Sequence, residues 1–142
     1  MSLLRLANGD DYPEASLKHL SDAEALLTKQ RPDGAAYLSG YVVECALKSL
    51  HFIETGQEYI GHDFSKLLSQ VVNAVAMVAG AKTAKYLGRA TSSVLSSVLQ
   101  YWKPDMRYQA PSISLGDAKT WYDCAKDIYY ETVHQMKQDG VI

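Results

Sequence analysis

Residues 40–52 read GYVVECALKSLHF and point to the fold class, because they are apolar over most of a helical circumference. Wound at about 100° per residue, the stretch leaves only a narrow arc that is not aliphatic. A helix with so little polar surface normally lies at the centre of a bundle or is covered by a second subunit. We therefore predict a central helix from Pro32 to Thr55, which Gly56 ends in a left-handed cap.

The narrow arc of this helix carries Tyr37, Gly40, Glu44, Lys48 and His51. On one interpretation the arc is a solvent-facing seam, in which Glu44 and Lys48 form an exposed i,i+4 pair that contributes a few tenths of a kcal/mol. On the other interpretation the arc lines a polar groove beside a long loop. The residue pattern alone leaves both open.

Helical spacing of apolar residues continues on both sides of this segment, without a sustained strand pattern. We expect a first helix from about Pro13, a third that starts at GHDF (61–64), a fourth from about Thr83 to Trp102, and a fifth capped by Asp117. The fifth has the clearest apolar stripe: Ala118, Trp121, Tyr122, Ala125, Ile128, Tyr129, Thr132, Val133 and Met136. The pattern predicts an all-α, up-and-down antiparallel bundle of four to five helices, a single domain over residues 1–142.

The connection over residues 103–116, KPDMRYQAPSISLG, is longer than most helix-to-helix loops, and such loops are often functional. It carries Arg107 and Tyr108. Arg107 either ties the loop to a carboxylate such as Glu44 or contacts a phosphate, because guanidinium suits both groups. At the start of the third helix, Asp63 is expected as an N-cap, while His62 is positioned to donate to a phosphate held at that helix end.

Composition narrows the classes of function. The chain has 142 residues, 47% apolar and 21% charged, with a net charge of −2, which argues against disorder and against a basic DNA-binding domain. No apolar run approaches the ~20 residues of a membrane span and no signal peptide is evident, so we expect a cytoplasmic protein. Glu131 and His134 form one Glu-x-x-His motif, but there is no second copy and both fall opposite the apolar stripe. We therefore expect no metal site and no cofactor.

Three segments together resemble the HEPN family, the nucleotide-binding domain of higher eukaryotes and prokaryotes. They are AYLSGYVVECALKSL (36–50), GHDFSKLL (61–68) and YWKPDMRY (101–108), and the similarity extends from about Tyr12 to Lys137. The residues that carry it are Glu44, Lys48, Gly61, His62, Asp63, Arg107 and Tyr108. The resemblance implies a helical bundle, often dimeric, associated with nucleotides or RNA. In bacteria it also implies a gene beside a minimal nucleotidyltransferase in toxin–antitoxin pairs.

Many HEPN proteins are ribonucleases with an Arg followed, after four to six residues, by a His, and no arginine here has a histidine at that range. Our first hypothesis is therefore a non-catalytic, dimeric HEPN-type domain that binds a nucleotide or RNA, or pairs with a nucleotidyltransferase. The second is a divergent ribonuclease toxin that uses Arg107 and His62. The third is a structural helical dimerisation or adaptor protein. The expected binding residues are Tyr37, Glu44, Lys48, His62, Asp63, Arg107 and Tyr108.

Overall fold

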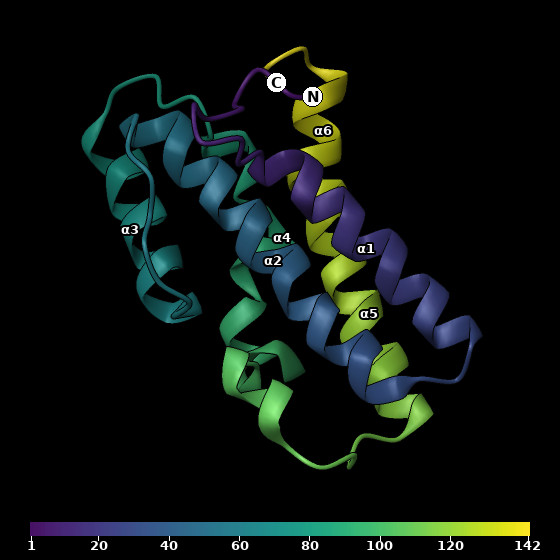
Figure 1. Cartoon of the computed structure of the whole chain (residues 1–142). Coiled ribbons are helices and arrows are strands. Elements are labelled where there is room, and N and C mark those ends of the chain that lie inside the picture. The colour runs from purple at the N-terminus through teal and green to yellow at the C-terminus, as the bar shows by residue number, and fades with distance from the viewer.

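The computed structural model describes all residues from Met1 to Ile142, and it contains helices but no strands. Its long helices are α1 (Tyr12–Thr28), α2 (Pro32–Thr55), α3 (Phe64–Met77) and α5 (Leu115–Tyr129). In Figure 1, α1, α2, the segment over residues 83–102 and α5 alternate in direction, and α3 lies outside them against α2. The predicted all-α bundle is confirmed.

The central position of α2 follows from its composition. Fourteen of its residues are buried, because α1 and α5 cover one side of the helix and α3 covers another. Pro32 occupies the first turn, where its missing N–H is not needed. Gly56 ends the helix at φ 70°, and its N–H donates to the Phe52 carbonyl at 2.8 Å. The predicted start, end and cap of this helix are all confirmed.

The last helix also follows its apolar pattern. All nine members of the predicted stripe are buried, and the helix continues through a π turn, η5 (Tyr130–His134), into α6 (Gln135–Gln138). The predicted cap at Asp117 is wrong. Ser114 is the N-cap, because its Oγ accepts the Asp117 N–H at 3.0 Å, and the helix begins at Leu115. In α3 the helix ends at Met77, and the next residue, Val78, is 51% exposed.

The predicted fourth helix from Thr83 to Trp102 is wrong. The segment is a chain of short turns, η1 (Ala84–Tyr86), α4 (Arg89–Ser92), η2 (Val94–Ser96) and η3 (Val98–Tyr101). Its serines explain the break, since the hydroxyls of Ser93, Ser96 and Ser97 donate to backbone carbonyls three residues earlier. The segment still buries Tyr86, Val94 and Leu99, whereas Leu95 and Tyr101 are exposed.

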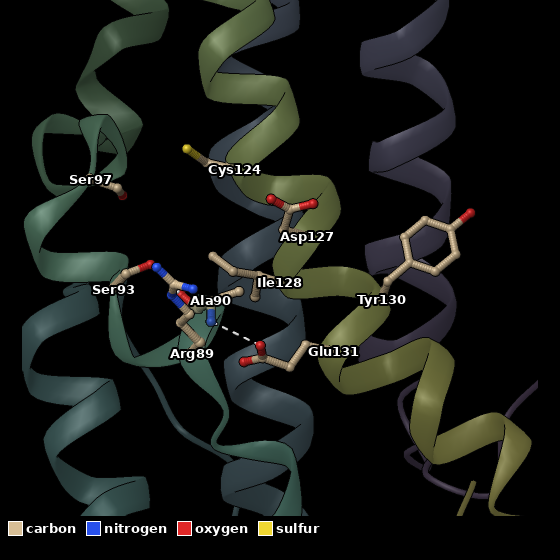
Figure 2. Close-up of a pocket in the computed structure, with 9 residues that line it drawn as sticks. All are labelled: Arg89, Ala90, Ser93, Ser97, Cys124, Asp127, Ile128, Tyr130 and Glu131. Atoms are coloured by element: carbon tan, nitrogen blue, oxygen red, sulfur yellow. Dashed lines mark hydrogen bonds between the residues drawn. The ribbon is translucent and has the colours of Figure 1, made fainter.

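One carboxylate holds this broken segment against the last helix. Glu131 accepts a hydrogen bond from the backbone N–H of Ala90 at 2.8 Å (Figure 2). It also accepts from the N–H and the hydroxyl of Thr91 at 2.7 and 2.6 Å. A Cβ at Gly88 would lie 2.7 Å from the Glu131 carboxyl carbon, so a larger residue there would displace this carboxylate. The expectation that Glu131 points away from the protein is wrong, because the segment packs on that flank of α5.

Candidate functional site

A group of six side chains, which we call the Tyr41 cluster, joins α2 to the loop before α3 and to the connection after residue 101. Its members are Tyr37, Tyr41, Glu44, His62, Trp102 and Arg107. Half-buried Tyr41 lies at the centre, edge-on to Trp102 with ring centroids 4.9 Å apart and edge-on to Tyr37 at 5.2 Å. Burial, together with the 3.2 Å hydrogen bond to the Tyr37 hydroxyl, raises the pKa of Tyr41 to about 12. Tyr41 is therefore a neutral hydroxyl at physiological pH.

Trp102 forms the rigid wall of the cluster. Its Nε1 donates to the Tyr37 carbonyl at 2.9 Å, and its ring stacks on Phe64 at 5.0 Å with an interplanar angle of 7°. The indole approaches α2 at Gly40, where a Cβ would lie only 2.0 Å from Nε1. The absence of a side chain at Gly40 thus allows the end of the 83–102 segment to reach the central helix.

Glu44 and Lys48 form a buried ion pair, which rules out the solvent-facing seam. Glu44 Oε1 lies 2.9 Å from Lys48 Nζ, and the two side chains are 4% and 9% exposed. The other carboxylate oxygen, Oε2, accepts from His62 Nδ1 at 2.8 Å. The predicted tie between Arg107 and Glu44 is therefore not formed. Because Nδ1 must carry a proton to donate to the carboxylate, Nε2 of the exposed His62 remains available to another partner.

Arg107 and Tyr108 end the short helix η4 (Pro104–Tyr108) and both are exposed. The guanidinium carbon of Arg107 lies 4.8 Å from the centre of the Tyr108 ring. Hydrogen bonding to Tyr108 and Tyr37 raises the pKa of Arg107, so this group stays a cation at every physiological pH. Tyr37 is thus near Arg107, and its hydroxyl is also hydrogen-bonded to Tyr41. The loop, the polar arc of α2 and the start of α3 meet at one place.

Asp63 has the structural role that the sequence suggested, since its Oδ1 accepts the Lys66 N–H at 3.0 Å and caps α3. Beside it lies a cavity of about 400 Å³, which we call the Lys103 cavity, between the start of α3 and residues 95–104. His62 and Trp102 line this cavity and also belong to the Tyr41 cluster. The cluster therefore opens onto a space that a small ligand can enter.

Sequence reasoning missed His19. Its ring lies 5.5 Å from that of Tyr41, and its Nδ1 is buried without a hydrogen-bond partner. Burial, and secondarily the charge of Lys18, lowers the pKa of His19 from its ordinary 6.5. The signal was present in the sequence, because His19 falls on the same face of α1 as the buried Ser16 and Ala23.

A second cavity, of about 480 Å³, lies between α5 and the 83–102 segment (Figure 2). Arg89, Cys124, Asp127 and Glu131 are among its lining residues. Both carboxylate oxygens of Glu131 are already occupied by α4 donors, and burial raises the pKa of the Cys124 thiol. No group of three or more His, Cys, Asp or Glu side chains in the chain is placed to hold a metal ion. The Tyr41 cluster is therefore the stronger candidate site.

Comparisons with known proteins agree with this architecture. The family profile described as HEPN domain matches residues 11–135, most of the chain. Searches of the curated proteins and of the solved structures each gave no match. No helix combines the length and the apolar character that crossing a bilayer requires. The chain belongs to the HEPN family.

Proposed function

We propose that this HEPN domain binds a phosphorylated nucleotide, free or as part of RNA, at the Tyr41 cluster, and that it does so without cleaving the ligand. One observation supports the proposal above the others. An exposed, permanently charged Arg107 lies near the hydrogen-bonded pair of Tyr37 and Tyr41, and the ring of Tyr41 also contacts an exposed His62 that the buried Glu44 holds in place.

Arg107 and His62 supply the phosphate contacts in this proposal. A guanidinium presents paired N–H donors that match phosphate oxygens. His62 is oriented before any ligand arrives, since its Nδ1 is fixed by Glu44 at 2.8 Å, and an oriented side chain loses less conformational entropy on binding. Its Nε2 donates to a phosphate oxygen when both ring nitrogens carry protons. The buried Lys48 neutralises Glu44, so the carboxylate does not repel an incoming phosphate as a bare charge would.

Tyr108 supplies the contact to the base. It is 77% exposed, and an aromatic face on a surface can stack on a base of any sequence. The cation above it, Arg107 at 4.8 Å, places a phosphate-binding group next to a stacking platform. Asp63 contributes by capping α3, the helix that follows His62. Glu44 contributes by holding the His62 ring through Nδ1, and Lys48 contributes by pairing with Glu44.

The same geometry favours binding over cleavage. Attack by a ribose 2′-hydroxyl needs one group that accepts a proton and a second that donates one. Arg107 stays a cation because its pKa is raised, so it cannot be the group that accepts the proton. A divergent ribonuclease toxin is the second candidate, favoured by the position of Arg107 and His62 around the same tyrosine pair.

The proposal also includes two protein partners, a second copy of the chain and a nucleotidyltransferase. Family resemblance supports a homodimer and a minimal nucleotidyltransferase partner of the toxin–antitoxin kind. The apolar circumference of α2, which suggested a dimer from the sequence, is covered within one chain by α1, α3 and α5. The dimer prediction therefore rests on the family alone, and light scattering of the purified protein across a concentration series tests it.

Titration calorimetry with ATP and with a short single-stranded RNA tests the binding proposal. Charge-assisted hydrogen bonds contribute about 1.5–3 kcal/mol, so Arg107→Ala should weaken binding by roughly 10- to 150-fold. Arg89→Ala, which removes an exposed arginine from the other cavity, is the matched control and should bind as the wild type does. No heat at millimolar ligand would reject the proposal in favour of the adaptor hypothesis.

Incubation of the same proteins with mixed RNA separates binding from cleavage. We expect the RNA to remain intact with the wild type and with both variants. RNA cleavage by the wild type that Arg107→Ala abolishes would instead establish the ribonuclease.

A further inference from the structure

A third cavity, of about 300 Å³, lies on the other side of the chain segment that borders the Lys103 cavity. Tyr101 forms one wall, together with Val98, and Ile113 and Trp121 lie among the residues opposite. We call it the Tyr101 cavity. It was not part of the site described above, and it brings the end of the 83–102 segment against the loop before α5.

Successive residues of the chain face the two cavities. Gln100, Trp102 and Lys103 line the Lys103 cavity, whereas Tyr101, between them, lines the Tyr101 cavity. The turn η3 and the residues after it therefore form a wall with a recess on each side. A ligand that occupies both recesses must cross this wall.

The chemistry of the wall suits a nucleic acid strand. Tyr101 is 70% exposed, and its ring offers a stacking surface for a base. Lys103 makes no ion pair and the side chain of Gln100 makes no hydrogen bond within the protein. They are free to contact a phosphate and a base edge, respectively.

We infer that the ligand of the proposed site is a single-stranded oligonucleotide of at least two nucleotides. One base enters the Lys103 cavity, the next enters the Tyr101 cavity, and the phosphate between them lies over Lys103. This inference rests on the proposed function and adds Tyr101 and Lys103 as the residues that select a strand over a mononucleotide. Lys103 and Arg107 are the two Lys or Arg side chains that contact phosphates in this arrangement, so stacking contributes much of the affinity and the dependence on salt is shallow.

Fluorescence anisotropy with a labelled six-nucleotide RNA, challenged by AMP, a dinucleotide, DNA of the same sequence and double-stranded RNA, tests the inference. We expect the dinucleotide and the hexamer to bind at least tenfold more tightly than AMP. Tyr101→Ala should weaken hexamer binding roughly fivefold to a hundredfold or more and leave AMP binding unchanged. For two phosphate contacts the log–log salt slope should be about −1.4, and about −0.7 in Lys103→Ala.

Tyr130→Ala is the control, because Tyr130 is also exposed but lines a different cavity, that of Figure 2. It should bind the hexamer as the wild type does. Equal affinity for AMP and the hexamer, or an unaffected Tyr101→Ala, would overturn the inference while leaving the proposed function intact. Failure of every nucleotide to bind would overturn both, and tight binding of double-stranded RNA alone would overturn the strand-specific geometry.

Discussion

Substitution of Gly40 by alanine should destabilise the protein, although alanine is the better helix former. The added Cβ would lie 2.0–2.1 Å from three atoms of the Trp102 indole, and Trp102 is only 5% exposed, so the ring must move. Overpacking costs about 1–3 kcal/mol and the broken bond to the Tyr37 carbonyl another 0.5–1.5 kcal/mol or so. The higher helix propensity of alanine offsets about 1 kcal/mol of this cost. The free energy of unfolding of Gly40→Ala should therefore be about 2 kcal/mol lower than that of the wild type.

Urea unfolding followed by tryptophan fluorescence measures this loss and also reports the environment of the indole. The control is Gly116→Ala in α5, where the nearest atom to an added Cβ is Ser114 Oγ at 4.0 Å, so the variant should be neutral or gain up to about 1 kcal/mol. If Gly40→Ala is as stable as this control and its emission spectrum is unchanged, the close approach of Trp102 to α2 is wrong. The Tyr41 cluster would then lack its fixed wall.

Three further perturbations test the interactions around the site. Glu44→Gln leaves the ammonium of Lys48 buried without a carboxylate and should cost about 3–5 kcal/mol in urea unfolding; a loss below about 1 kcal/mol would contradict the buried pair. Burial lowers the pKa of His19 below its ordinary value of 6.5, so the unfolded chain takes up a proton at a higher pH than the folded chain does. The free energy of unfolding should therefore decrease as pH falls from 6.5 toward the pKa of His19 in the folded protein. His19→Phe should flatten the stability profile between pH 7 and 5, and an unchanged slope would reject the assignment. Glu131→Ala frees three donors of α4, so hydrogen exchange at the Thr91 amide should accelerate; wild-type protection would show that Glu131 does not hold the segment.

The helices with dense apolar stripes could be predicted from the sequence. In α2 the positions of Pro32 and Gly56 fix both ends, and in α5 every predicted stripe residue is buried. These segments obey local rules, because most of their burial follows from the helical period. The 83–102 segment does not follow these local rules. Its serine hydroxyls compete for backbone carbonyls, and its position depends on the Glu131 carboxylate, which lies far along the chain.

The candidate site was predictable in its parts but not in its bonds. The sequence indicated that Glu44, His62 and Arg107 would meet, and the structure brings them around Tyr41. It did not indicate that Glu44 bonds His62 instead of Arg107, because both side chains can donate to a carboxylate and neither lies on the helix of Glu44. The contact between Gly40 and Trp102 could not be inferred at all, since nothing local links a helix glycine to an indole in a distant turn.

The most direct test of the central claim is a two-dimensional ¹H–¹⁵N NMR titration of the protein with AMP and then with a short single-stranded RNA. We expect the largest chemical-shift changes at Tyr37, His62, Arg107 and Tyr108 and at the Trp102 indole N–H, whose proton bonds α2. Residues around Glu131 should remain unperturbed. Shifts centred on the cavity of Figure 2, or no shifts at millimolar ligand, would contradict a nucleotide site at the Tyr41 cluster.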